Sequence, residues 1–184
     1  MMWSLPVSVE IDGKEYSIRN KCDYRVVLDV IVVLNDAELD VQNRIMCALL
    51  IFYEDLSGCT NFEEAAKKMM TIINMGEEAE EEETSKPQLM DWNHDFPQIA
   101  PPISRVLGYS VRDANRYTHW FDFVGAYMEI GECTFSNIIS IRTKRIKGKK
   151  LETWEQEFYK ENKKLVDLPQ NLTEEEKDWL ESDW

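Results

Sequence analysis

The sequence is poor in histidine and lacks the short motifs that mark common catalytic sites. Its two histidines, His94 and His119, are too few for a histidine-rich metal site. It contains no Gly-x-x-x-x-Gly-Lys-Ser/Thr, no Gly-x-Ser-x-Gly and no His-Glu-x-x-His. His94 lies between Asp91 and Asp95 and is the better acid–base candidate, but a capping or surface role is favoured. We therefore expect a binding or structural protein rather than an enzyme, with no metal and no cofactor.

Long apolar runs and positive charge are also scarce. No run approaches the roughly 20 apolar residues that cross a bilayer, and the N-terminus resembles no secretory signal. The chain has 21 Lys and Arg against 35 Asp and Glu, a net charge of -14 in 184 residues. Phosphate groups repel such a surface, which disfavours nucleic acid and anionic membranes as partners. The composition predicts a soluble protein of the cytoplasm.

The four cysteines, Cys22, Cys47, Cys59 and Cys133, include no Cys-x-x-Cys pair. Cys47 lies in an apolar run, where a thiol behaves as a small hydrophobic group. Two disulfides remain open, but nothing indicates an oxidising compartment. We expect reduced thiols in the core.

The first half of the chain predicts a β-hairpin followed by helices. Two runs that alternate apolar and polar residues, 7–11 and 14–18, flank Asp12-Gly13, a strong hairpin signal. Three helices are expected after it: 24–34 capped by Asp23, 41–53 capped by Asp40, and one to about Met75 opened by the capping box Thr60-x-x-Glu63. The β-branched content of 24–34 leaves a strand open there.

The second half predicts further helices, with one interruption. Pro97, Pro101 and Pro102 should reduce 89–108 to short helices or turns, because proline removes a backbone donor and restricts the residue before it. The strongest amphipathic pattern predicts a core helix over 111–130 that is opened by Ser110-x-x-Asp113. Two more helices are expected, 135–145 capped by Thr134 and a charged one over 152–165. The fold class is thus mainly α with an N-terminal β-hairpin.

The sequence contains two acidic segments, a linker within the chain and a tail at its C-terminal end. Six glutamates within 77–83, followed by Thr84-Ser85-Lys86-Pro87, predict a mobile linker over 77–88, with a charge-rich helix end as the alternative. A Ca²⁺ loop is disfavoured, because the ligand spacing is wrong. The predicted organisation is a hairpin with helices (1–76), this linker, a helical region (89–169) and an acidic tail (170–184).

In its aromatic segment and in the helix predicted after it, the chain resembles the bacteriophage "gene product fifteen" family of long-tailed phages. The similarity rests on His119-Trp120-Phe121-Asp122-Phe123 and on the Thr134–Arg142 segment, with the hairpin in front and a charged helix ending at Leu168-Pro169. It spans about residues 5–170. The sequence departs from the pattern at its three clustered prolines, where relatives read as an unbroken helix, and at Ile141, where an aromatic residue is usual.

The resemblance implies a tail assembly chaperone. Such proteins coat the tape-measure protein in the host cytoplasm until the tail tube polymerises, and they are absent from the finished particle. The expected partners are therefore the tape-measure protein and further copies of the chain. The alternative is a structural tail or head-tail connector protein that stays in the particle.

Large aromatic and clustered basic side chains are the candidate partner-binding residues. The basic run 142–150 predicts a contact between copies, with a solvated helix end as the alternative. The acidic tail carries two tryptophans, which predicts docking on a neighbouring copy or on the tape measure, with packing on its own core left open. The candidates are Trp120, Phe123, Tyr127, Arg142, Lys144, Arg145, Lys147, Trp179, Leu180 and Trp184.

Methionines are candidates to line an apolar groove for the tape measure, because their side chains adapt to irregular partners. For each of them, filling the chain's own core is the favoured role. They are Met46, Met69, Met70, Met75 and Met128.

Overall fold

The computed structural model describes residues 4–77 and 87–169, and its fold is mainly helical with an N-terminal hairpin, as predicted. Strands β1 (Ser8–Ile11) and β2 (Lys14–Ser17) pair antiparallel. Both turn residues have positive φ, 49° at Asp12 and 75° at Gly13, as this two-residue turn requires.

Eight helices follow within the described residues, after a short 3-10 turn at Arg19–Lys21. They are α1 (Tyr24–Leu34), α2 (Val41–Phe52), α3 (Phe62–Ile73), α4 (Trp92–Leu107), α5 (Trp120–Met128), α6 (Thr134–Ile146), α7 (Thr153–Glu161) and α8 (Lys163–Val166).

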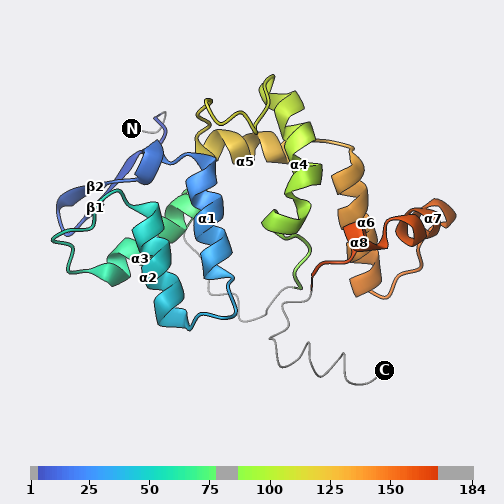
Figure 1. The fold of residues 1–184 in the computed structure, drawn as a ribbon, viewed down its shortest axis with the longest axis horizontal. Helices are drawn as coiled ribbons and strands as arrows, with labels where there is room; N and C mark the ends of the chain where they lie inside the picture. The colour runs from blue at the N-terminus through green and yellow to red at the C-terminus, as the bar shows by residue number, and fades with distance from the viewer. Residues whose placement is uncertain (1–3, 78–86, 170–184) are drawn as a thin grey trace.

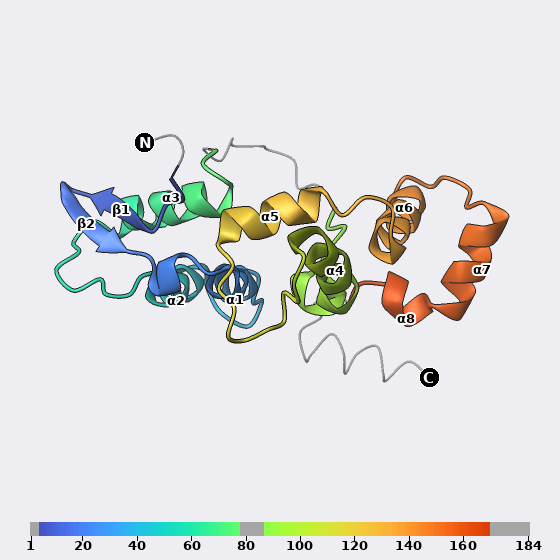
Figure 2. The same cartoon turned by 90° about the horizontal axis from the view of Figure 1, so that it is seen from above.

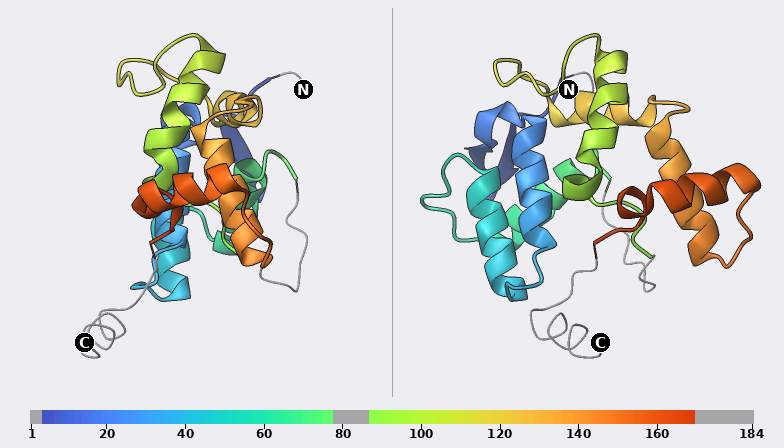
Figure 3. Two further views of the ribbon diagram at one scale, coloured as in Figure 1. Left: turned by 90° about the vertical axis from the view of Figure 1, so that its right-hand side faces the viewer. Right: turned by 45° about the vertical axis from the view of Figure 1, so that its right-hand side comes forward.

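The helices lie side by side along an elongated molecule. The hairpin and α1–α3 form one end, α4 and α5 the middle, and α6–α8 the other end (Figures 1 and 2). Helix α5 lies at the top of α1 and reaches the side of α4, whose upper end extends beyond it, and the turned views show α6–α8 beside α4 (Figures 1 and 3). Consecutive elements are thus neighbours in space for most of the chain.

The main core contains residues that precede the segment 78–86 and residues that follow it. Tyr24 of α1 stacks on Phe123 of α5 with ring centroids 4.3 Å apart, and Trp120 Nε1 donates a 3.0 Å hydrogen bond to Ile73 O of α3. A second, smaller apolar cluster of Ile138, Ile141 and Val166 holds α6 to α8. The predicted linker falls almost wholly outside the described residues, so its mobility remains a prediction.

The first helices follow their predicted caps closely. Asp23 accepts a hydrogen bond from Arg25 N at the start of α1, and Asp40 accepts one from Asn43 N at the start of α2. The strand alternative for 24–34 is excluded. Helix α3 is the exception, because Asn61 and not Thr60 is its cap: Asn61 Oδ1 accepts from Glu64 N at 3.1 Å.

The prediction that prolines would interrupt 89–108 is wrong. Helix α4 runs unbroken through Pro97, Pro101 and Pro102. It starts where Asp91 accepts from His94 N at 2.8 Å. Its inward side chains, which include Ile99 and Ile103, are fully buried. Burying such a side chain contributes about 1.5–3 kcal/mol, which offsets the hydrogen bonds that the prolines remove.

The long helix predicted over 111–130 is shorter, because 111–119 forms turns and α5 begins at Trp120. Arg25 binds the carbonyl oxygens of Val111, Asp113 and Arg116 at 2.8–3.1 Å. Tyr24 OH donates to the same Val111 oxygen at 2.7 Å. These tertiary hydrogen bonds take the carbonyls that a helix would have used, so Ser110 does not open one.

Two boundaries near the C-terminal end also differ from prediction. The N-cap of α6 is Cys133, one residue before Thr134, and Ser136 Oγ accepts from Cys133 N at 2.9 Å. The single helix expected over 152–165 is two helices, α7 and α8, separated at Asn162. All four cysteines are free thiols, but only Cys22 and Cys59 are buried in the core as predicted, whereas Cys47 and Cys133 are half-buried. Burial raises the pKa of Cys22 to about 12.

Candidate functional site

The outward face of α2 is apolar and carries no exposed charge. Its exposed apolar side chains are Val41 (67% exposed), Ile45 (38%), Met46 (40%) and Leu50 (59%). The other exposed residues of the helix are Gln42 and Asn43. We call these six residues the α2 surface. On a chain in which 30% of residues are charged, a helix face without charge is unusual.

The one charged residue of α2 is turned back onto the protein. Arg44 is half-buried, and its Nε donates a 2.7 Å hydrogen bond to Leu39 O. The guanidinium therefore anchors the loop before the helix instead of solvating its outer face. This geometry leaves the six residues of the α2 surface without a charged side chain; the nearest exposed charge along the chain is the N-cap Asp40, which accepts a hydrogen bond from Asn43 Nδ2.

The α2 surface is not needed to hold α2 in place. The helix packs through the fully buried Ala48, Leu49 and Phe52. At its C-terminal end Arg19 donates to the carbonyls of Leu50, Ile51 and Tyr53 at 2.8–3.0 Å, which satisfies acceptors that a helix end leaves free. The outward side chains are thus presented on a helix that is held by its buried face and by its C-terminal end.

Such a surface has the composition of a protein-binding site. Charged residues are depleted and Met is enriched at the centres of interfaces, and contiguous exposed apolar side chains mark interaction sites. Of these six residues, only Met46 is a groove-lining candidate from the sequence, and none is among the aromatic and basic candidates. For the other five residues of the α2 surface, the one feature of the sequence that could have indicated a binding site is the scarcity of charge: residues 41–52 contain one charged residue in twelve.

At the other end of the molecule, Arg142 forms a buried ion pair that joins distant segments. Its guanidinium binds both oxygens of Asp95 at 2.7 and 2.8 Å. Both side chains are almost fully buried, 5% and 0% exposed. Arg142 also donates to the carbonyls of Leu89, Leu165 and Val166 at 2.6–3.1 Å. One side chain therefore connects α4, α6 and α8.

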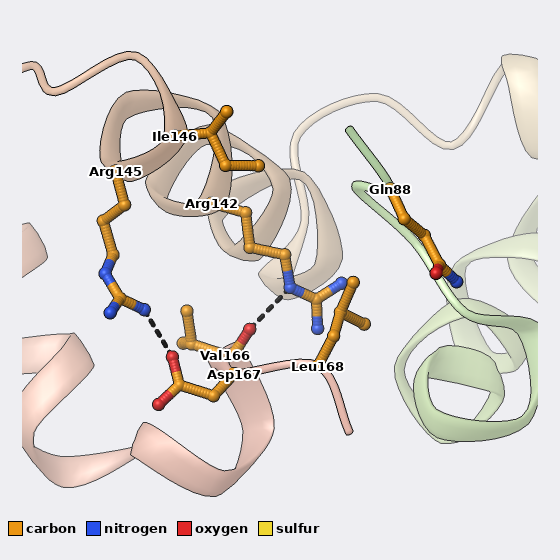
Figure 4. Close-up of a pocket in the computed structure, with 7 residues that line it drawn as sticks. All are labelled: Gln88, Arg142, Arg145, Ile146, Val166, Asp167 and Leu168. Atoms are coloured by element: carbon orange, nitrogen blue, oxygen red, sulfur yellow. Dashed lines mark hydrogen bonds and ion pairs between the residues drawn. The ribbon is translucent and has the colours of Figure 1, made fainter. Parts of the chain in front are cut away.

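A groove of about 380 Å³ lies beside Arg142 (Figure 4). The α6 side contributes Arg142, Arg145 and Ile146, the α8 end contributes Val166, Asp167 and Leu168, and Gln88 lies opposite. Arg145 forms an ion pair with Asp167 across the groove. We call this the α6–α8 groove.

The next basic residue, Lys144, also has a partner within the chain. Its Nζ binds the two oxygens of Glu155 at 2.7 and 2.8 Å, and the Glu155 side chain is fully buried. Burial raises the pKa of Glu155, but hydrogen bonds from Lys144 and from Glu152 N outweigh it and leave the pKa below its usual value. Glu155 is therefore charged at neutral pH.

The structure separates the aromatic and basic candidates into three sets. Trp120, Phe123 and Arg142 are buried and Tyr127 is half-buried; Lys144 and Arg145 are paired within the chain, and Lys147 is exposed. The third set, in the tail, lies outside the described residues: Trp179, Leu180 and Trp184. Partner binding by any of them remains a prediction.

Both histidines have structural partners. His119 caps α5: its Nδ1 accepts from Phe121 N at 3.0 Å, so Nε2 carries the proton that faces Pro6 O at 2.9 Å. His94 Nε2 lies 3.2 Å from Leu165 O. Within the described residues no three His, Cys, Asp or Glu side chains gather as a metal site, and no helix is long and apolar enough to span a bilayer.

These features define a class: a mainly helical, acidic chain with an N-terminal hairpin and a neutral helix surface. The family is given by comparison with known proteins. A family model described as Bacteriophage Gp15 protein matches residues 1–168, and the chain belongs to this family. Searches of curated proteins and of solved structures found no significant match.

Proposed function

We propose that this chain is a non-enzymatic tail assembly chaperone that binds the tape-measure protein through the α2 surface. It acts in the host cytoplasm and leaves before the tail is complete. The single observation that carries the proposal is the absence of exposed charge along α2 in a chain of net charge -14. Family membership supplies the phage context.

The spacing on α2 suits a helical partner. Val41 and Ile45 are four residues apart, and so are Met46 and Leu50, so each pair lies one turn apart on the helix. Such pairs form ridges that fit the grooves of another helix. A tape-measure protein is a long, largely helical chain with apolar stripes, which would aggregate if left exposed.

The overall charge complements this binding mode. Many copies bound along one tape-measure chain would each add a net charge of -14, and mutual repulsion keeps such a complex soluble. The neutral α2 surface faces the partner while the acidic remainder faces water. The same protein thus covers apolar stripes and prevents the covered chains from associating.

A charge placed on the α2 surface tests the proposal. Val41→Glu and Leu50→Glu should each reduce capture of the co-expressed tape-measure protein by about tenfold, because the new carboxylate loses its water in the interface. Val106→Glu is the matched control, because Val106 is also an exposed helix valine, 41% exposed on α4. Equal capture by all three variants, with unchanged melting temperatures, would reject the α2 surface.

Mass spectrometry of purified particles tests the role itself. A chaperone should be abundant in infected cells and absent from mature tails. A copy number in mature tails comparable with that of tail structural proteins would support the structural or connector alternative.

A further inference from the structure

The α6–α8 end of the molecule is positively charged, unlike the rest of the chain. Residues 142–169 contain nine basic and five acidic residues, a net charge of +4, whereas the whole chain has a net charge of -14. Three of the basic residues are used internally by ion pairs to Asp95, Glu155 and Asp167. The remaining six basic residues are lysines with exposed side chains.

Three of these lysines follow the end of α6 directly. Lys147, Lys149 and Lys150 are exposed, and no ion pair within the described residues involves them. Lys147 comes directly after Ile146, which lines the α6–α8 groove and is half-exposed. A groove that exposes Ile146 and Leu168 next to Lys147 fits a segment that combines large apolar side chains with carboxylates.

Two residues that line this groove are close in sequence to acidic segments. Gln88 comes two positions after the segment 78–86, and Leu168 comes two positions before the tail 170–184. The first segment contains no large apolar residue. The tail has a net charge of -5 and carries Leu172, Trp179, Leu180 and Trp184.

We propose that residues 170–184 bind the α6–α8 groove of their own chain. Trp179 and Leu180 cover Ile146 and Leu168, the two apolar residues of the groove that are not fully buried, and the tail carboxylates lie near Lys147 and Lys149. Trp179 lies eleven positions after Leu168, and an extended chain spans about 3.3–3.6 Å per residue. That length suffices for a reversal, and a short tether gives a millimolar effective concentration.

The large apolar side chains select the tail over the glutamate-rich segment. Charge does not distinguish the two acidic segments, because each exposed ion pair contributes little to binding. A tryptophan indole buries a large apolar surface when it docks, and of the two segments only the tail contains tryptophan. The docking requires no other protein, so it stands or falls separately from tape-measure binding.

Photo-cross-linking in the full chain tests the proposal. The probe is p-benzoylphenylalanine in place of Trp179, in an equal mixture of unlabelled and ¹⁵N-labelled protein. Mass spectrometry should find cross-links to peptides that contain Ile146 or Leu168, within one isotope form. Cross-links to other regions, or between the two isotope forms, would overturn docking within the chain; the latter would assign the tail to a neighbouring copy.

Matched charge reversals give a second readout. Lys147→Glu with Lys149→Glu should reduce the intrachain cross-link yield by roughly fivefold or more at low salt, since two attractions become repulsions. Lys67→Glu with Lys68→Glu on α3 changes the net charge equally and should leave the yield unchanged. Equal yields from both pairs would show that the lysines beside the groove do not hold the tail.

Discussion

Arg142 connects parts of the chain that are distant in sequence. Its guanidinium binds Asp95, 47 residues earlier, and carbonyls of the α8 segment more than 20 residues later. Because both charged groups are buried, removing either one leaves the other without a partner in a medium that solvates charge poorly. In the sequence Arg142 is simply the first residue of a basic run, and only its burial separates it from the exposed lysines nearby.

We predict that Arg142→Met lowers the free energy of unfolding by about 3–5 kcal/mol, because Asp95 becomes an uncompensated buried charge. Lys67→Met is the comparison, since its ion pair with Glu63 is exposed at both side chains, 73% and 79%, and should cost at most about 1 kcal/mol. Urea unfolding followed by circular dichroism measures both. Similar losses in the two variants would contradict the structural role of the buried pair.

At the scale of elements, α4 shows how packing overrides local preference. Three prolines lie within its sixteen residues, and each removes a backbone hydrogen bond. Pro102 is buried, whereas Pro97 and Pro101 are exposed. The exposed pair contributes little packing, so it mainly weakens the helix.

We predict that Pro101→Ala stabilises the protein by about 1–2 kcal/mol. The substitution restores an N–H donor in the helix interior, a gain of about 3 kcal/mol, and loses roughly 1 kcal/mol because the unfolded chain becomes more flexible. Thermal unfolding would measure the change.

Pro102→Ala is the control for this prediction. It restores a donor as well, but it also removes buried apolar contacts and leaves a cavity, so its gain should be smaller. A lower melting temperature of the Pro101→Ala variant would contradict the prediction, because it would show that Pro101 stabilises α4.

Segment 111–119 is the opposite case, in which tertiary contacts prevent a helix. The amphipathic pattern over 111–130 predicts one long helix, and its second half forms as α5. In the first half the backbone carbonyls bind Arg25 and Tyr24 of α1. A pattern along the chain contains no information about donors that are contributed by a distant helix.

At the scale of the whole molecule, the neutral α2 surface and the net charge of -14 act in opposite directions on self-association. Contact through α2 would bury apolar side chains, which is favourable. The acidic remainder of each copy repels the next at low ionic strength. Salt shortens the range of this repulsion to about 10 Å at 0.1 M and leaves apolar contacts intact.

We therefore predict that self-association increases between about 20 and 300 mM NaCl, as measured by light scattering after size-exclusion chromatography. Leu50→Glu should abolish the increase, and Val106→Glu should retain it. Association that weakens with salt would instead indicate attraction between the basic α6–α8 end and acidic segments of another copy, as the basic run in the sequence predicts.

Features that depend on neighbouring residues could be predicted from the sequence. The hairpin results from Asp12-Gly13, because a two-residue turn needs positive φ at both positions. Helices α1 and α2 begin after Asp23 and Asp40, because a carboxylate accepts from the free N–H groups of the first turn. The resemblance to the phage family was also readable from residue patterns alone.

Features that depend on distant partners were set by the three-dimensional packing. The unbroken α4, the turns before α5, the buried pair of Arg142 with Asp95 and the groove beside it all come from contacts between segments far apart in the chain. The α2 surface belongs here as well, because apolar residues occur on every side of that helix. Only packing shows that Ala48, Leu49 and Phe52 face the core while Met46 and Leu50 face outward.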